Sequence, residues 1–257
     1  MDLELNGLRV LLTGASDGIG LEAARLLRAE GAAVAIASRD PAAAAEAIGA
    51  SAIPVDLALP EGGEQAVTGT VAALGGLDAL VNNVGTARVA SFEQLTDADW
   101  QDAWNLNVMS HVRCIRAALP ALCESPSPSI VNVASTSGKR PSPGMPHYSV
   151  TKAAVLSLSR LVADLYASAG IRSNAVCPGP TLTPAWTATG GLAEQTAADS
   201  DRSRDDVLTA VGRGRPLGRM ATSDEIAVVI AFLCSPRAAY VTGAAWSVDG
   251  GTVPVII

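Results

Sequence analysis

The residues whose types and spacing could perform acid–base chemistry are a tyrosine and a lysine four positions apart, Tyr148 and Lys152. On a helix, side chains four apart project from one face, so a phenol would stand beside an ammonium. A tyrosine ordinarily titrates near pH 10, and a nearby cation lowers that pKa. Such pairs also arise by chance, but this chain has only two lysines, Lys139 and Lys152, among 18 basic residues. Arginine could not replace Lys152 in proton chemistry because its guanidinium keeps its proton.

Composition limits the protein classes to which the chain could belong. Its 257 residues are 49% hydrophobic and 17% charged, enough to form one compact domain over residues 1–257. The net charge of −7 argues against a nucleic-acid surface, which needs a clustered basic face. No apolar run approaches the roughly 20 residues of a membrane helix, and the start does not resemble a signal peptide, so we expect a cytoplasmic protein. Four widely spaced cysteines and two histidines predict reduced, mostly buried thiols and no metal site.

Short apolar runs alternate with amphipathic segments along the chain. Runs that are apolar throughout predict strands buried on both faces, and they are Leu8–Leu12, Ala33–Ala37, Ala79–Val81, Ile130–Val133, Ser173–Val176 and Ala244–Val248. A further strand, third in the chain, is expected to end at Val55-Asp56-Leu57. The predicted helices include Ile19–Glu30, Pro41–Ala47, Trp100–Leu122, Ser149–Ser168 and Asp224–Cys234. This alternation predicts an α/β fold, a parallel sheet with helices on both faces. The segment Pro178–Pro216 has weak periodicity and is expected to be a long functional loop.

A glycine-rich turn follows the first strand, from Thr13 to Gly20. The unpaired backbone N–H groups at the start of the next helix suit a pyrophosphate, and glycine lets the backbone approach it. A tight strand–helix connection is the alternative interpretation. The candidate cofactor-binding residues of the turn are Gly14, Ser16, Asp17, Gly18, Ile19 and Gly20.

Ser38 and Arg39 follow the second strand, where a cofactor with a free ribose 2′-hydroxyl would require an acidic residue. The planar guanidinium of Arg39 matches a 2′-phosphate, so the sequence favours NADP(H) over NAD(H), although Asp40 could pair with Arg39. Asp56 could accept from an adenine amino group or cap the next element. Asn83 could tie strand ends together or contact the adenosine ribose. The neighbouring candidates are Leu57, Val84 and Gly85.

Several motifs, in this order and at these separations, resemble those of the short-chain dehydrogenase/reductase family in its compact form, over essentially the whole chain. They are Thr13–Gly20, Asn82–Gly85, Asn107, Ser135, Tyr148 with Lys152, Pro178-Gly179 and Asp249-Gly250-Gly251. Val84 replaces the usual alanine, and Thr151 stands where serine commonly precedes the lysine. The resemblance implies a Rossmann-type, doubly wound sheet of seven strands. It also implies a dimer or homotetramer, in which Trp100–Leu122 and Ser149–Ser168 pair with their copies.

The resemblance further implies the roles of the catalytic residues. Tyr148 would donate a proton to a substrate carbonyl as hydride arrives, or remove the alcohol proton in reverse. Lys152 would lower the pKa of Tyr148 and bind the nicotinamide ribose. Ser135 would hydrogen-bond the carbonyl oxygen where charge develops. Asn107 would hold a water that links Lys152 to solvent.

The resemblance also assigns the region after the sixth strand. Pro178 and Gly179, with Thr181 or Thr183, would contact the nicotinamide carboxamide and the phosphates. Residues of about 180–216 would form a substrate lid, and its candidate apolar wall is Leu182, Trp186 and Leu192. His147 is expected to have a structural or substrate-lining role. Lys139 and Arg140 are expected to be solvated loop charges, with an acidic substrate as the alternative partner.

The leading hypothesis is an NADP(H)-dependent carbonyl reductase or alcohol dehydrogenase acting on a small molecule. Among specific relatives, 3-oxoacyl carrier-protein reductases are similar. However, residues 122–125 and 166–170 lack the basic side chains that would meet an acidic carrier, so a free ketone is equally compatible. The alternatives are an NAD-dependent alcohol dehydrogenase, a non-catalytic NADP(H)-binding sensor and a sugar-nucleotide epimerase. The intact Ser135, Tyr148 and Lys152 argue against the sensor, which needs no proton donor.

Overall fold

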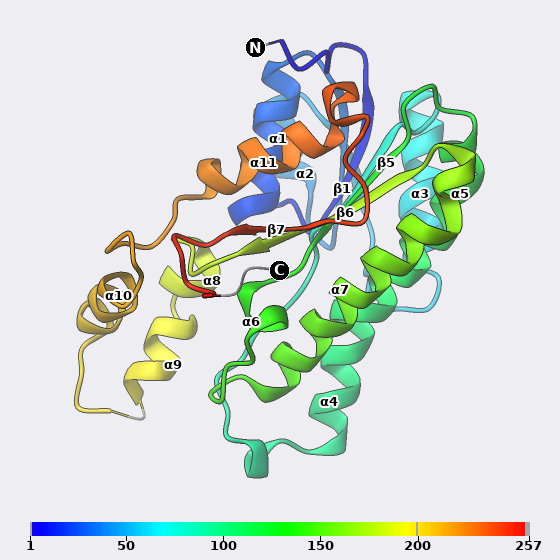
Figure 1. Ribbon diagram of the computed structural model, residues 1–257. Helices are drawn as coiled ribbons and strands as arrows, with labels where there is room; N and C mark the ends of the chain where they lie inside the picture. Colours follow the sequence, from blue (N-terminus) through cyan, green and yellow to red (C-terminus); the bar gives the residue numbers. More distant parts are fainter. Residues whose placement is uncertain (1, 199, 255–257) are drawn as a thin grey trace.

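A computed structural model describes residues 2–198 and 200–254, and a seven-stranded, all-parallel sheet lies at its centre (Figure 1). The strands are β1 (Arg9–Thr13), β2 (Ala33–Ser38), β3 (Ser51–Pro54), β4 (Ala79–Asn82), β5 (Ser129–Val133), β6 (Arg172–Pro178) and β7 (Ala245–Val248). Their order is β3-β2-β1-β4-β5-β6-β7, so the winding reverses between β1 and β4. In such sheets ligands bind outside the carboxyl ends of the strands near this reversal. The predicted α/β fold is confirmed.

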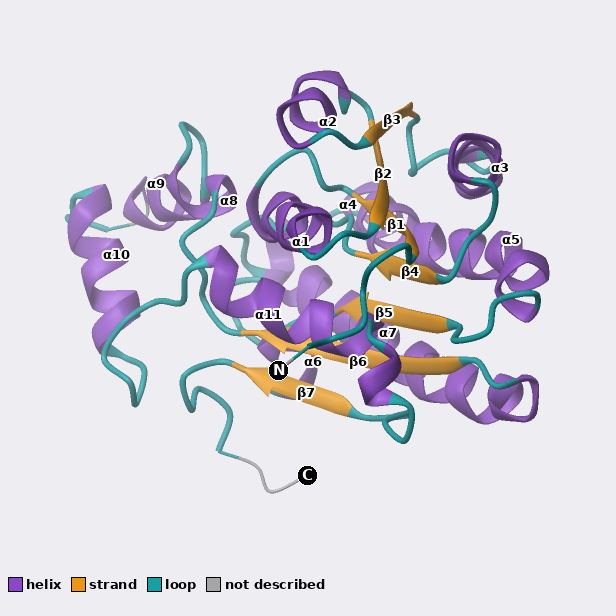
Figure 2. Cartoon of the chain, turned by 90° about the horizontal axis from the view of Figure 1, so that it is seen from above, coloured by secondary structure: helices purple, strands orange, loops and turns teal. Residues whose placement is uncertain are grey.

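Helices cover both faces of the sheet (Figure 2). One face carries α1 (Gly18–Ala29), α2 (Ala42–Ile48) and α11 (Ser223–Cys234). The other carries α3 (Gly62–Leu74), α5 (Ser110–Cys123) and α7 (Pro146–Tyr166). An apolar core fills each side, because β1, β4 and β5 are buried on both faces. No helix among residues 2–198 and 200–254 is long and apolar enough to cross a bilayer.

The smaller elements lie between these layers or beside them. They are α4 (Asp97–Trp104), α6 (Thr136–Lys139), α8 (Pro184–Thr187), α9 (Leu192–Ala198) and α10 (Arg204–Arg213), the π-helical turn η2 (Asn105–Met109), and the 3₁₀ turns η1 (Phe92–Gln94), η3 (Ala167–Ala169) and η4 (Pro236–Ala238). All four cysteines are free thiols, three of them buried and Cys123 exposed, as the sequence predicts.

Two predicted elements have different bounds in the structure. The helix expected over Trp100–Leu122 is divided into α4 and α5 by η2, whose wider turn contains Asn107. The π-helical turn spans five residues, too few for its wider period to be told from that of an α-helix. The third strand ends at Pro54 rather than at Asp56, because its partner β2 ends at Ser38, which accepts the last bond from Val55 N at 2.8 Å.

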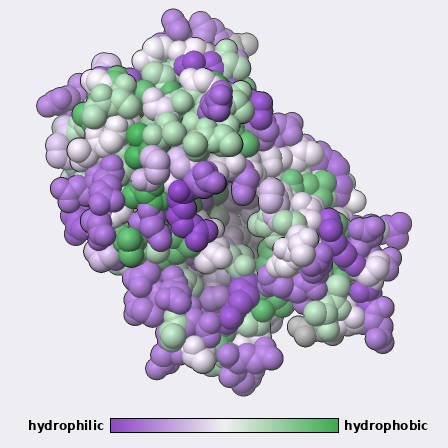
Figure 3. Space-filling model, turned by 180° about the vertical axis from the view of Figure 1, so that it is seen from behind, coloured by the Kyte–Doolittle hydropathy of each residue, from purple (hydrophilic) through white to green (hydrophobic). Residues whose placement is uncertain are grey.

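The prediction of a long loop over Pro178–Pro216 is wrong, because three helices, α8, α9 and α10, lie within it. Pro184 occupies the first turn of α8, and Ser203 with Asp206 forms a capping box at the start of α10. Helices of four to ten residues show too few turns for a clear periodicity. These helices stand beyond the sheet in Figure 1, and Figure 3 shows a hollow in the surface beside the lobe that holds α9 and α10.

Candidate active site

The structure brings Ser135, Tyr148 and Lys152 together at the carboxyl end of β5. Pro146 begins α7, so Tyr148 lies in the first turn of that helix and Lys152 in the next. Ser135 follows β5 directly and caps α6, where its Oγ accepts from Ser137 N at 3.1 Å. The Lys152 ammonium donates to Val133 O at 2.7 Å and lies 5.8 Å from the centroid of the Tyr148 ring. Tyr148 and Lys152 therefore lie in successive turns of α7, and Ser135 begins the helix α6 that packs beside it.

The electrostatics of the tyrosine differ from the expectation that Lys152 lowers its pKa. Burial raises the pKa of Tyr148 above its usual value, and a hydrogen bond with Ser135 acts in the lowering direction. Lys152 does not compensate, because its ammonium points at Val133 O rather than at the phenol. Burial also lowers the pKa of Lys152 to about 8. Tyr148 is therefore a neutral phenol at neutral pH in this structure.

Asn107 lies on η2 and is fully buried beside this cluster. Its Oδ1 accepts from Thr86 N at 2.8 Å, and its Nδ2 donates to Thr86 O and to Thr151 Oγ1, both at 3.0 Å. The amide nitrogen has thus used both protons within the protein. One lone pair of Oδ1 is left for a water, so the water that would link Lys152 to solvent stays a prediction.

The glycine turn packs against the residues that follow β4. Gly14 has a φ of +61°, and a Cβ there would stand 2.7 Å from Val84 Cα. A Cβ at Gly20 would stand 2.5 Å from Asn83 Nδ2, which donates to Thr13 O and Gly14 O at 3.1 and 2.7 Å. Asn83 therefore ties two strand ends together, one of the two roles expected for it. These contacts fix the turn that opens α1 at Gly18, so the N–H groups at the start of the helix are presented at the edge of the sheet.

The end of β2 fits a phosphate on the adenosine ribose. The Ser38 hydroxyl is buried and has no hydrogen-bond partner within the described part of the chain. Arg39, next to it, is exposed, and no ion pair joins it to Asp40 among residues 2–198 and 200–254. An orphaned hydroxyl beside an unengaged guanidinium matches the donors that a 2′-phosphate accepts from.

The other residues expected to contact the nucleotide differ in how accessible they are to a ligand. Asp56 follows β3, and its Oδ1 accepts from Ala58 N at 2.9 Å, so it caps a turn and keeps one oxygen free. Leu57 is 2% exposed and packs in the apolar core, which leaves only its backbone for a ligand. Gly85 is exposed after β4, and Val84 packs partly against the core.

The segment after β6 reaches back over the glycine turn. Pro178 ends β6, and Gly179 N donates to Val248 O at 3.0 Å. Thr181 is buried, and its hydroxyl donates to Gly179 O at 3.0 Å, so that hydroxyl is already engaged. A Cβ at Gly18 would stand 3.4 Å from Thr183 Cβ, which places Thr183 above the turn. Of the two threonines expected near the cofactor, Thr183 is the one whose hydroxyl makes no hydrogen bond to the residues that the structure describes.

Three polar residues near Ser135 and Tyr148 were expected to have no catalytic role, and one of them lies differently than predicted. Lys139 lies at the end of α6 rather than in a loop, and its exposed Nζ donates to Ala245 O at 2.7 Å and Ser247 Oγ at 3.0 Å. Arg140 is exposed. His147 is buried, and its ring lies 6.3 Å from the Trp100 ring, edge to face, which agrees with a structural role.

The three residues expected to form the apolar wall of the lid differ in their solvent exposure. Leu192 is 6% exposed, Trp186 is partly buried and Leu182 is 46% exposed. Gln195 of α9 accepts with Oε1 from Val89 N at 2.9 Å, so the 180–216 segment touches the loop after β4. Gln195 has no distinguishing signal in the sequence.

Two buried polar residues near the site were not predicted. The Thr13 hydroxyl accepts from Asn83 N at 3.0 Å and Val84 N at 3.2 Å. His111 on α5 donates from Nε2 to Val84 O at 3.3 Å, and burial lowers its pKa to about 3, so the ring is neutral. The signal for His111 is a lone histidine on the apolar face of a helix, which alone cannot tell a core residue from a functional one.

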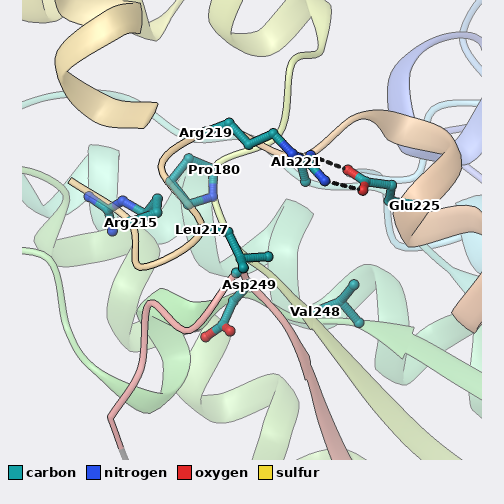
Figure 4. A pocket seen from close by; sticks show the side chains of 9 residues that line it. Pro180, Arg215, Leu217, Arg219, Ala221, Glu225, Val248 and Asp249 are labelled. Carbon is teal, nitrogen blue, oxygen red and sulfur yellow. Dashed lines mark hydrogen bonds and ion pairs between the residues drawn. The ribbon is translucent and has the colours of Figure 1, made fainter. Parts of the chain in front are cut away.

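A separate pocket of about 120 Å³ lies where the 180–216 segment meets β7 (Figure 4). It is lined by Pro180, Arg215, Leu217, Arg219, Ala221, Glu225, Val248, Asp249 and Gly250. Its charges are engaged: Arg219 pairs with Glu225 at 2.6 Å, and Asp249 accepts from Gly251 N and Val253 N, both at 3.0 Å. Neither Tyr148 nor Lys152 lines this pocket, so the chemistry is not placed there.

The chain matches a family model described as Enoyl-(Acyl carrier protein) reductase over residues 14–253. Together with the relatives below, this match shows that the chain belongs to the short-chain dehydrogenase/reductase family, and it is an oxidoreductase acting on CH–OH groups. It is 36% identical over 264 residues to the uncharacterised oxidoreductase YvrD of Bacillus subtilis, with 98% of this chain and 99% of that protein covered.

Two further relatives carry a named activity. The 3-oxoacyl-(acyl-carrier-protein) reductase FabG of Staphylococcus aureus is 33% identical over 250 residues, which cover 94% of this chain and 96% of that enzyme. The solved structure of L-sorbose reductase from Gluconobacter frateurii, complexed with NADPH and L-sorbose, is 34% identical and has a TM-score of 0.90, with 100% of both chains covered.

Proposed function

We propose that this enzyme reduces a ketone to a secondary alcohol, or catalyses the reverse reaction, with NADP(H) and with Tyr148 as the acid and base. The observation that carries the proposal is the placement of Ser135, Tyr148 and Lys152 at the carboxyl end of β5, with Ser135 at the start of α6 and the other two on the adjoining turns of α7. A sensor that only binds a nucleotide has no use for a buried proton donor held in this way.

The neutral phenol suits the reductive direction. NADPH, when bound, supplies the hydride that reduces the carbonyl carbon. The carbonyl oxygen then takes the proton of Tyr148, so the product is an alcohol and the phenol becomes a phenolate. Ser137 N occupies a lone pair of Ser135 Oγ, which leaves the Ser135 proton free to donate to the same oxygen. Lys152 Nζ lies 5.8 Å from the centroid of the Tyr148 ring, so turning its ammonium from Val133 O toward the phenol would stabilise the phenolate that forms.

The preference for NADPH rests on the end of β2. Ser38 and Arg39 offer hydroxyl and guanidinium donors that no protein group uses among the described residues. Thr183 and the start of α1 would hold the phosphates, and Gly85, Pro178 and Gly179 would border the nicotinamide. The L-sorbose reductase structure contains NADPH, which supports the same cofactor here.

The test is NADPH oxidation, beside NADH, across ketones, ketoses, β-ketoesters, quinones and acyl thioesters. Tyr148→Phe removes only the phenol oxygen and should abolish turnover while leaving NADPH affinity largely intact. Tyr166→Phe on the same helix is the matched control and should keep wild-type rates. Cofactor binding without turnover on any substrate would favour the sensor. Residual turnover in Tyr148→Phe would assign the proton to another group.

We further propose that residues of about 180–216 form the substrate lid, within a single domain over residues 1–257. Gln195 reaches the loop after β4 at Val89, so this segment spans the space outside the catalytic residues. Gln195→Ala should change the KM for the carbonyl compound more than the NADPH affinity. An unchanged KM, or a change in NADPH affinity alone, would contradict the lid.

We also propose a homo-oligomer built on α4, α5 and α7. The outer face of α7 exposes Val150, Leu161 and Leu165 to 49%, 53% and 58%, and Trp104 on α4 is 38% exposed. Burying these side chains against a second copy removes apolar area from water. Sedimentation should show a dimer or tetramer that Leu161→Asp dissociates, and a monomeric wild type would contradict the proposal.

A further inference from the structure

Thr151 has no part in the proton steps above, yet its hydroxyl stands at a junction between two elements of the site. It precedes Lys152 on α7 and is fully buried. Its Oγ1 donates to Tyr148 O at 2.8 Å and accepts from Asn107 Nδ2 at 3.0 Å. One hydroxyl thus connects the helix that carries Tyr148 with the π-helical turn that carries Asn107.

The hydrogen-bond directions fix the orientation of the Asn107 carboxamide. A hydroxyl has a single proton, and that of Thr151 goes to Tyr148 O, so toward Asn107 it can only accept. This places Nδ2 at Thr151 and at Thr86 O, and Oδ1 at Thr86 N. A flipped carboxamide would set its oxygen against Thr86 O and its nitrogen against Thr86 N, which would break both of those hydrogen bonds. It could regain a bond to Thr151 only if that hydroxyl gave up Tyr148 O.

The Asn107 carboxamide in turn holds the loop after β4 near the catalytic lysine. Both hydrogen-bonding groups of the Thr86 backbone end on Asn107. The preceding Gly85 runs between Asn107 and Lys152, since a Cβ there would stand 3.2 Å from Asn107 Oδ1 and 3.3 Å from Lys152 Nζ. The distance between this loop and the acid–base helix therefore depends on the amide orientation.

We propose that Thr151 is a positioning residue, whose hydroxyl fixes the Asn107 carboxamide and thereby sets the Gly85–Thr86 backbone against Tyr148 and Lys152. The consequence for catalysis rests on the proposed function, because the loop would border the nicotinamide. The positioning itself is a property of the protein alone. It requires the hydroxyl, not the methyl group, of the threonine.

The experiment compares Thr151→Val, which keeps the shape and removes the hydroxyl, with Thr151→Ser, which keeps the hydroxyl. Thr70→Val is the matched control, because Thr70 is equally buried in a helix and donates to the carbonyl four residues earlier, Ala66 O at 2.8 Å. Two readouts are taken in each variant: hydrogen exchange of the Thr86 amide, and kcat and KM of NADPH-dependent reduction.

In Thr151→Val we expect the Thr86 amide to exchange about tenfold faster and kcat to fall about tenfold, the scale set by one lost hydrogen bond, with KM within about twofold. Thr151→Ser should restore both values, and Thr70→Val should change neither. Unchanged Thr86 exchange in Thr151→Val would overturn the positioning, and faster exchange with full kcat would overturn its role in the reaction. Hydrogen exchange of the Thr86 amide can be measured without turnover. A wild-type protein that reduces no carbonyl compound would therefore contradict the proposed function, whereas the exchange rates would still test the positioning role of Thr151.

Discussion

The glycine turn after β1 and the tyrosine helix α7 are built in opposite ways, although both lie at the same edge of the sheet. The turn depends on missing atoms, because Gly20 leaves room for the Asn83 amide and for the backbone of Gly14 and Ala15. The helix depends on atoms that are present, through the hydrogen bonds of Lys152, Thr151 and Ser135. Adding atoms to the glycine turn should therefore destabilise it, whereas α7 should lose its arrangement when hydrogen-bonding atoms are removed.

The largest effect is expected from the charge of Lys152. Its folded pKa of about 8 lies below the ordinary value of 10.5, so between these pH values the unfolded chain binds the proton and the folded chain does not. Stability then rises as pH increases from about 8 to about 10.5, by about 3 kcal/mol from this residue. The difference in unfolding free energy between wild type and Lys152→Met, without cofactor, should show this rise, whereas that for Lys139→Met should not. A flat difference would mean that Lys152 is solvated, and the contrast between the two regions would weaken.

The turn is tested by adding one methyl group. Gly20→Ala places a Cβ 2.5 Å from Asn83 Nδ2 and 2.8 Å from Ala15 Cα and Gly14 O, and such overpacking costs about 2–3 kcal/mol. Chemical denaturation should report this loss, with weaker NADPH binding. Gly144→Ala is the control, since a Cβ there meets no heavy atom within 4 Å. Equal unfolding free energies of the two variants would show that the turn can shift to accommodate a Cβ at residue 20.

The end of β2 differs from both the glycine turn and α7. Its hydrogen-bond donors, Ser38 and Arg39, are present but have no partner among the described residues. Arg39→Ala should weaken NADPH by about 2 kcal/mol, the scale of a charged hydrogen bond, and leave NADH nearly unchanged. Arg116→Ala, which removes an exposed charge on α5, should affect neither cofactor. Calorimetric titration with both cofactors measures this, and equal losses for NADPH and NADH would remove Arg39 from the phosphate site.

The smallest effect is expected outside both regions, at Lys139. Its two hydrogen bonds to β7 are solvent-accessible, so Lys139→Ala should lower the unfolding free energy by about 1 kcal/mol or less. Arg140→Ala, which removes the neighbouring exposed charge, should have no measurable effect in the same denaturation experiment. If Lys139→Ala lowered the unfolding free energy as much as Gly20→Ala does, the contact between α6 and β7 would be as important for stability as the glycine turn.

The sequence predicts much of this arrangement because its signals are local. Apolar runs locate the strands that are buried on both faces, and the Tyr148–Lys152 spacing places both residues in successive turns of α7. Residues that follow parallel strands gather at one edge of the sheet, which is why Ser135, assigned by the family resemblance, and Asn83 lie at the same edge.

What escaped prediction depends on contacts between distant segments. The π-helical turn at Asn107 is stabilised by Thr86 and Thr151, which lie 21 and 44 residues away. The raised pKa of Tyr148 reflects how deeply the folded chain buries the phenol, and the lysine that should have opposed it is turned toward Val133. Lys139 resembles a surface charge in the sequence because its acceptors are more than 100 residues away.

The bond between Lys139 and Ala245 O also affects how copies of the protein meet in solution. β7 is one of the two edge strands of the sheet, and its outward backbone groups could template a strand from another molecule. An ammonium that occupies a carbonyl there brings a positive charge to the rim, and two such rims repel each other. The residue that adds little to stability can therefore protect the folded protein from edge-to-edge aggregation at high concentration.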